Sequence, residues 1–189
     1  MQAAQAGHAK PLWRSIVETL IAIGMLLFLA QALFSTTVIT GEAMSPTLRT
    51  GQSLLVSRVP YVLNAPARGD VVVVRNRIDP SILLAMRVVG LPGDRVNVKG
   101  AQISINDQPL REPYLAESSE RLSVGTTTVG QYRVGQDEYF LVNDNRVDIA
   151  NSRSSGMFTR DDLYGRAWLV YWPIESIKAV AHIRPTTDP

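Results

Sequence analysis

The feature that most constrains this chain is a long apolar segment close to its N-terminus. Residues 16–34 are almost entirely apolar, and no charged residue occurs from Thr19 to Gly41. A helix needs about 20 predominantly apolar residues to cross the hydrocarbon core of a bilayer. A buried helix of a globular domain usually carries polar residues along one face, and this segment does not. The sequence therefore predicts one transmembrane helix, at residues 15–36.

Basic residues on either side of this segment predict its orientation. Lys10 and Arg14 precede it, and the next basic residue is Arg49. Because basic residues favour the cytoplasmic side of a membrane, we expect residues 1–14 in the cytoplasm. Residues 37–189 then form a single domain on the opposite side of the membrane.

A cleavable secretory signal is the alternative interpretation of the same segment. The tripeptide Ala30-Gln31-Ala32 fits the small-x-small pattern of a cleavage site. The apolar run is longer than the 7–15 residues that such signals usually contain, which favours an uncleaved anchor. Both interpretations place the remaining domain outside the cytoplasm.

Beyond residue 41, helical periodicity gives way to short β-rich runs bounded by turn residues. One pair of runs, residues 101–110, predicts a hairpin that turns at Asn106-Asp107. The other predicted strands are residues 53–56, 71–74, 96–98, 132–134, 138–142 and 167–172. The sequence therefore predicts a mainly β domain, a barrel or a sandwich, on one N-terminal transmembrane helix.

Composition excludes several classes of function. The chain has no cysteine, which rules out disulfides, thiolate nucleophiles and cysteine-bound zinc. Its two histidines, His8 and His182, lie near opposite ends of the chain, and we expect neither a metal site nor a cofactor. A net charge of +2 without a cluster of basic residues argues against nucleic-acid binding. Three lysines occur in all: Lys10, Lys99 and Lys178.

Four sequence motifs follow the apolar segment. They are ITGEAMSPTL (residues 39–48), ARGDVVVV (67–74), RVVGLPGDRV (87–96) and VNDNRVDIANSR (142–153). In order and spacing they resemble the sequence boxes of bacterial type I signal peptidases, and LYGRAW (163–168) extends the resemblance to about Pro173. The resemblance implies a single-pass protein of the bacterial inner (cytoplasmic) membrane with a signal-peptidase-like β domain on its extracytoplasmic face.

The same resemblance implies a serine nucleophile and a neutral lysine as general base. Serine is a weak nucleophile unless a base lies within hydrogen-bond reach, and lysine acts as that base only when burial lowers its pKa. The nucleophile position is Ala43 here, and the base position is Met86. In the last box, the serine that orients the lysine aligns with Ile149, and an aspartate aligns with Asn151. We therefore expect an apolar pocket in place of a catalytic one.

Other motif positions keep the residues of the family, and these residue types suit structural roles. They are Gly41, Met44, Pro46, Thr47, Arg87, Gly90, Pro92, Gly93, Asp94, Asp144, Asn145, Arg146, Ser152 and Arg153. The pattern favours loss of chemistry with retention of the fold.

Displaced catalysis would need a new nucleophile and a new base. Ser45, Thr40 and Thr47 lie near the usual nucleophile, but neither Lys99 nor Lys178 falls within a matched motif. Without a base, we expect Ser45 to be an ordinary residue of a turn, with no catalytic role.

Three functions follow as hypotheses. The first is a catalytically inactive signal peptidase homologue that acts as a scaffold or accessory subunit for other proteins in the bilayer. The second is a groove that binds signal peptides or other extended peptides by strand addition and releases them uncut. The third is an active peptidase that uses displaced residues. Aromatic residues near the end of the chain, Trp168, Tyr171 and Trp172, suit either the core or a membrane interface. The strand pattern favours the core for Trp168.

Overall fold

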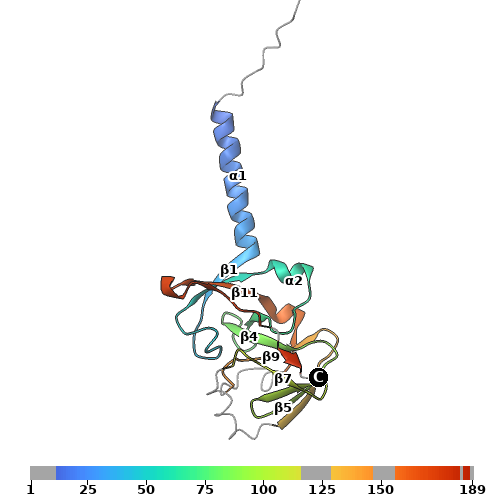
Figure 1. Cartoon of the computed structure of the whole chain (residues 1–189). Helices are drawn as coiled ribbons and strands as arrows, with labels where there is room; N and C mark the ends of the chain where they lie inside the picture. The colour runs from blue at the N-terminus through green and yellow to red at the C-terminus, as the bar shows by residue number, and fades with distance from the viewer. Residues whose placement is uncertain (1–11, 116–128, 147–155, 184, 188–189) are drawn as a thin grey trace, which may run out of the picture.

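The computed structural model describes residues 12–115, 129–146, 156–183 and 185–187. One long helix, α1 (Leu12–Leu33), projects from a mainly β domain (Figure 1). Residues Trp13–Leu33 are long and apolar enough to cross a membrane, and none of the helix is buried against the domain. The predicted mainly β domain with one N-terminal apolar helix is confirmed.

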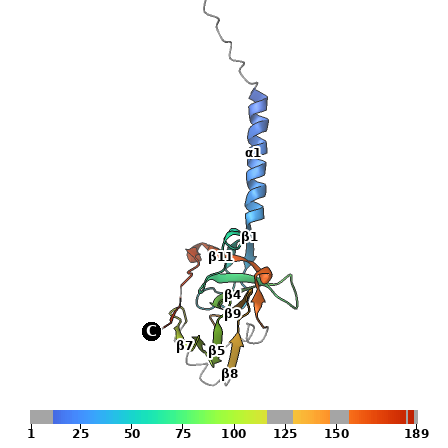
Figure 2. The same ribbon diagram turned by 90° about the vertical axis from the view of Figure 1, so that its right-hand side faces the viewer.

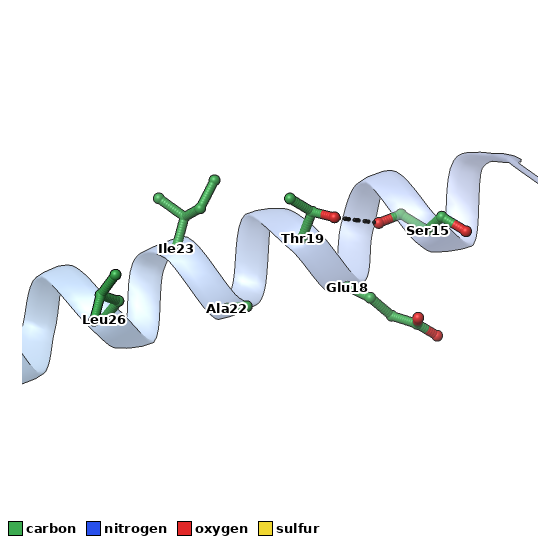
Figure 3. Close-up of a pocket in the computed structure, with 6 residues that line it drawn as sticks. All are labelled: Ser15, Glu18, Thr19, Ala22, Ile23 and Leu26. Atoms are coloured by element: carbon green, nitrogen blue, oxygen red, sulfur yellow. Dashed lines mark hydrogen bonds between the residues drawn. The ribbon is translucent and has the colours of Figure 1, made fainter.

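Four of the five polar side chains of α1, Arg14, Ser15, Glu18 and Thr19, lie in its N-terminal half, and the fifth is Gln31. Figure 3 shows Ser15 and Thr19 one turn apart, with Glu18 pointing away from them; all three line an open hollow formed by α1. The Thr19 hydroxyl donates to the Ser15 carbonyl oxygen at 2.8 Å, so it is satisfied within the helix. Between Thr19 and Gln31 the helix has only apolar residues, which suits a membrane anchor.

The helix ends at Leu33, three residues before the predicted boundary at 36. Phe34 begins strand β1 (Phe34–Val38), which pairs with β2 (Ser53–Ser57) in antiparallel register. Periodicity missed this strand because its residues continue the uncharged run of the helix. The anchor therefore passes into the sheet without a linker, and the β1 end of the sheet lies directly beneath the helix (Figures 1 and 2).

Two antiparallel sheets make up the domain. The larger sheet has the strand order β1-β2-β11-β3-β4-β9-β10, with β12 paired to β11, and the smaller has the order β13-β7-β6-β5-β8. The smaller sheet lies at the end of the domain far from α1 (Figures 1 and 2). The bounds not given above are β3 (Val71–Arg75), β4 (Leu83–Gly90), β5 (Arg95–Lys99), β6 (Gln102–Ile105), β7 (Gln108–Arg111), β8 (Val129–Arg133), β9 (Glu138–Val142), β10 (Phe158–Thr159), β11 (Leu163–Trp172), β12 (Lys178–Ala179) and β13 (Thr186–Thr187), with a short helix α2 (Val59–Leu63) and 3-10 turns η2 (Arg160–Asp162) and η3 (Ile174–Ser176).

The core explains why the valine-rich runs are strands. In β3 all four valines are buried, and alternate side chains enter two different clusters, one on each face of the sheet. A third cluster joins the two sheets through Val89 on β4, Val96 on β5 and Phe140 on β9. The predicted hairpin is β6–β7, and its turn residues Asn106 and Asp107 have φ of 52° and 70°, as a two-residue hairpin turn requires.

Candidate functional site

The first motif and the part of β4 that precedes the third motif meet in one pocket. Ala43 and Met86, the two positions where the resemblance implies a nucleophile and a base, both line a cavity of about 110 Å³. Met86 lies on β4 and is 2% exposed, whereas Ala43 lies in the loop after β1 and is half-buried. The other lining residues are Ile39, Thr40, Gly41, Met44, Leu83, Leu84, Ala85 and Asn143.

Most of the residues that line this pocket have apolar side chains. Among the described lining residues, Thr40 has the one hydroxyl and Asn143 the one side-chain amide. None of these residues carries an ionisable side chain, so none of them can accept a proton as a lysine or carboxylate would. Met86 is unbranched and flexible, which suits it to filling space along the pocket wall. Ala43 and Met86 thus lie in mostly apolar surroundings, and the predicted contribution of Ile149 to this pocket stays a prediction.

A buried ion pair lies next to Met86. The Arg87 guanidinium donates from Nε to Asp144 Oδ1 at 2.8 Å and from Nη2 to Asp144 Oδ2 at 2.7 Å. Both side chains have no exposed surface. Thr47 of the first motif donates its hydroxyl to the same carboxylate at 2.5 Å, and Arg87 Nη1 donates to the carbonyl oxygen of Gly69 at 2.9 Å. The Arg87 side chain, in the third motif, thus contacts residues of the other three motifs.

The last motif is fixed to the first through its backbone. The Asn145 N–H donates to the Ala43 carbonyl oxygen at 2.9 Å, and the Asn145 side-chain amide donates to the Glu42 carbonyl oxygen at 3.2 Å. These bonds hold the loop that carries Ala43 against the loop after β9. The retained asparagine therefore positions the pocket wall.

Arg146 makes a second buried ion pair that the sequence did not reveal. Its Nη2 pairs with Glu112, its Nη1 donates to the Ala101 carbonyl oxygen at 2.7 Å, and its side chain is 1% exposed. Burial alone would lower the pKa of Arg146, but Glu112, with smaller contributions from Tyr114 and Asp144, raises it above its ordinary value. Glu112 also accepts a hydrogen bond from the Tyr114 hydroxyl. Burial raises the pKa of that phenol far above its ordinary value.

Tyr114 joins the two ion pairs, because its ring lies 3.9 Å from the Arg87 guanidinium carbon. Sequence reasoning missed Glu112 and Tyr114 because they follow the hairpin and lie outside every motif. The one available signal was the need of a buried Arg146 for an acidic partner.

The third motif ends in a tight turn held by Asp94. Its carboxylate accepts hydrogen bonds from the Leu91 N–H at 2.8 Å, Arg68 Nη2 at 2.8 Å and Asn106 Nδ2 at 2.9 Å. Gly93 has φ of +88°, a conformation that favours glycine. Pro92 is exposed at the turn.

Close packing and backbone shape account for other retained residues. A Cβ on Gly90 would lie 2.7 Å from Phe140 Cβ, so only glycine fits there without a shift. Gly41 has φ of +81°. Met44 is 1% exposed and packs in the core, and Pro46 follows a cis peptide bond at the exposed end of the first motif.

The structure keeps Ser45 out of the pocket and Lys99 in the other sheet, but it places Lys178 beside the first motif. Ser45 does not line the pocket, and within the described ranges no hydrogen bond joins it to a lysine. Lys178 donates its Nζ to the Thr47 backbone oxygen at 2.8 Å, on an exposed part of the surface. Lys99 lies on β5, in the smaller sheet. Lys178 is thus nearer to the first motif than the sequence suggested, but it faces a carbonyl oxygen.

The family model described as "Signal peptidase, peptidase S26" matches residues 12–172, from the anchor helix to the end of β11. The chain belongs to the signal peptidase family. The match includes all four motifs, so family membership rests on the whole domain and its anchor.

Individual signal peptidases are similar over most of this chain. Signal peptidase I P of Bacillus subtilis subsp. natto is 32% identical over 163 residues, which cover 84% of this chain and 87% of that protein. Signal peptidase I U of Bacillus subtilis (strain 168) is 32% identical over 168 residues, covering 86% and 89%. A crystal structure of a signal peptidase I from Enterococcus faecalis V583 aligns with a TM-score of 0.48 and 24% identity, over 55% of this chain and 97% of that one.

One edge of the signal peptidase pocket is an open strand. Strand β9 pairs with β4 from Arg87 to Gly90, and on that side residues 83–86 have no strand partner among the described residues. These same four residues line the pocket. The pocket therefore borders a length of backbone that can accept another strand.

Residues 147–153 of the last motif lie outside the described residues, and four of them are predicted site residues. They are Ile149, Asn151, Ser152 and Arg153. Their predicted roles stay predictions.

Proposed function

We propose that this chain is a non-cleaving, membrane-anchored member of the signal peptidase family. One observation carries the proposal: among the described residues, none that lines the pocket where Ala43 and Met86 meet has an ionisable side chain. Serine–lysine hydrolysis needs a hydroxyl and a neutral amine within hydrogen-bond reach of each other. The retained motif residues instead build the buried network around Arg87 and Asp144, which supports the fold.

The proposed location is the bacterial inner membrane, with the N-terminus in the cytoplasm and the β domain on the extracytoplasmic face. The apolar α1 and the basic residues before it support this orientation. A domain that keeps the fold but lacks the nucleophile and the base suits the role of a scaffold or accessory subunit in a membrane protein complex.

Capture of an extended peptide is the second candidate role, and the open edge of β4 favours it. Main-chain hydrogen bonds to residues 83–86 would give affinity, and the adjoining apolar pocket would receive a small apolar side chain. Signal peptides and other extended apolar peptides have this chemistry. A peptide bound there meets no nucleophile–base pair, so it leaves intact.

A gain-of-function series tests the proposal. Ala43→Ser, Met86→Lys and the double variant are compared with the unaltered chain for cleavage of a preprotein in detergent. We expect the unaltered chain and both single variants to be inert, because each lacks one member of the pair. Activity that appears only in the double variant shows that the geometry of the groove survives. Activity in the unaltered chain would refute the proposal and support displaced residues.

A binding assay separates the two candidate roles. Fluorescence anisotropy of a labelled signal peptide is measured with the unaltered chain and with Ala43→Phe, which fills the pocket. The phenyl ring would occupy the space that a peptide side chain needs, and a loss of about 1–3 kcal/mol in binding free energy would weaken affinity by roughly five-fold to 150-fold. A thermal melt of the variant shows whether the domain itself stays folded. Ala179→Phe, on the exposed strand β12, is the matched control and should bind normally. No binding by the unaltered chain would leave the scaffold role as the better account.

A further inference from the structure

Two arginine side chains share one tyrosine ring where the larger sheet adjoins α1. The guanidinium carbons of Arg58 and Arg75 lie 4.5 and 5.0 Å from the centroid of the Tyr164 ring. Arg58 also donates to the Tyr164 hydroxyl, which donates to Ser35 Oγ at 2.8 Å. These four residues come from β1, the end of β2, β11 and β3, which are consecutive in the sheet.

The positive charge of this cluster is not balanced. Neither Arg58 nor Arg75 forms an ion pair within the described part of the chain. The nearby carboxylates of Asp70 and Asp162 pair with other arginines. The surrounding polar groups, first the Ser35 hydroxyl and then the two guanidiniums, lower the pKa of the Tyr164 phenol. The cluster therefore presents a positive potential to solvent.

Its side chains are also accessible. Arg75 is exposed, and Arg58, Tyr164 and Ser35 are half-buried. Guanidinium groups present planar sets of N–H donors that match the oxygens of a phosphate or carboxylate. Two of them on one aromatic ring form a compact site for an anion.

The end of α1 places this site relative to the membrane. The Arg58 backbone N–H donates to the carbonyl oxygen of Leu33, the last residue of the helix, at 2.9 Å. The helix has 22 residues, which at about 1.5 Å each span roughly 33 Å. The hydrocarbon core of a bilayer is about 30 Å thick, so Leu33 lies at its outer boundary. Arg58 then lies at the level of the lipid headgroups.

Exposed aromatic side chains on β11 also suit a location at the membrane surface. Trp168 is 51% exposed and stacks on Phe34, the residue that follows α1, with ring centroids 5.5 Å apart. This overturns the expectation that Trp168 lies in the core. Trp172 is 54% exposed on the same strand. Tryptophan is enriched where the membrane meets water.

We propose that Arg58, Arg75 and Tyr164 bind the phosphate of an anionic phospholipid headgroup in the outer leaflet beside α1. The proposal rests on α1 spanning the bilayer, and it does not depend on whether the chain cleaves peptides. A lipid bound there would fix the rotation of the domain about its anchor, because β1 follows the helix without a linker.

Native mass spectrometry of the full chain tests this proposal directly. The protein in detergent is offered equal amounts of phosphatidylglycerol and phosphatidylcholine with the same acyl chains, and the ratio of the two bound lipids is measured. We expect the unaltered chain to prefer phosphatidylglycerol. Loss of one arginine should lower the preference about five-fold, which corresponds to the roughly 1 kcal/mol that a basic residue contributes near an anionic membrane. Arg58→Gln with Arg75→Gln should abolish it.

Matched variants separate the site from general charge. Arg95→Gln with Arg133→Gln removes the same charge from paired strands of the smaller sheet, far from α1, and should leave the preference unchanged. Arg58→Lys with Arg75→Lys keeps the charge but loses the planar sets of N–H donors, so it should lower the preference less than Arg58→Gln with Arg75→Gln does. A thermal melt of each variant confirms that the domain is folded.

Three results would overturn the proposal. The unaltered chain could bind both lipids equally, or the Arg95 and Arg133 variant could lose the preference as fully as the Arg58 and Arg75 variant. In the third, millimolar inorganic phosphate displaces phosphatidylglycerol completely, which identifies a site for free anions. Extraction of the chain from membranes by alkaline carbonate would instead refute the anchor itself, and so distinguishes failure of that premise from failure of the site.

Discussion

Replacing Asp144 by asparagine should unfold the domain at a much lower temperature. The substitution keeps the shape of the side chain but removes the charge opposite a guanidinium that has no exposed surface. Asp144 accepts three hydrogen bonds, two from Arg87 and one from Thr47. An asparagine side chain has one acceptor oxygen and turns an amide N–H₂ toward these donors, so it cannot accept all three.

The size of the effect follows from the burial of the pair. Removing one partner of a buried ion pair destabilises a protein by about 3–5 kcal/mol. For a domain of this size each kcal/mol corresponds to roughly 2–4 °C in melting temperature, so the melting temperature should fall by about 6–20 °C. The assay is thermal unfolding of the full chain in detergent, followed by circular dichroism.

An exposed ion pair supplies the control. Asp107 pairs with Arg95, and their side chains are 66% and 62% exposed. Surface pairs contribute about 0–1 kcal/mol, so Asp107→Asn should shift the melting temperature little. Replacing both buried partners, Arg87→Met with Asp144→Leu, should cost less than the two single changes added together. Equal melting temperatures for Asp144→Asn and Asp107→Asn would refute the view that the retained motif residues hold the fold.

Two further predictions concern stability. Gly90→Ala should destabilise the domain by about 1–3 kcal/mol because the new Cβ would lie 2.7 Å from Phe140 Cβ; Gly24→Ala, where a Cβ meets nothing, is the control for a chemical denaturation measurement. Burial, and then the Arg166 guanidinium, lower the pKa of His182 below its ordinary 6.5, against the opposing Asp70 carboxylate. The unfolded chain therefore takes up the proton first, so the unfolding free energy should fall as the pH drops from about 6.5 to the lowered pKa and not above that range. His182→Gln should flatten this slope in melts across pH 5–8, and an unchanged slope would show that another group titrates.

Local patterns in the sequence predicted much of the fold. The apolar run predicted α1, the valine run predicted β3, and Asn106-Asp107 predicted the turn between β6 and β7. Strand β4 was not predicted as a strand, although it carries Met86 and Arg87. Its β-rich stretch was interpreted only as part of a sequence motif.

Contacts between distant segments could not be predicted in the same way. Glu112 pairs with Arg146, and Arg87 lies over Tyr114, but no spacing in the sequence connects these residues. The stacking of Trp168 on Phe34 likewise joins distant segments, because β1 and β11 both flank β2. By contrast, the meeting of Ala43 and Met86 in one pocket followed from the resemblance to a family, and the structure places both residues there.

The most direct test of the claim that this chain does not cleave peptides is a cleavage assay of the unaltered chain. A preprotein with an intact signal peptide is incubated in detergent with an excess of the purified protein, beside an active signal peptidase I and a blank without protein. If Ala43 and Met86 have removed the nucleophile and the base, the unaltered chain cleaves no faster than the blank while the active enzyme completes the reaction. Cleavage at the signal-peptide site well above the blank would contradict this account and require a nucleophile elsewhere in the chain.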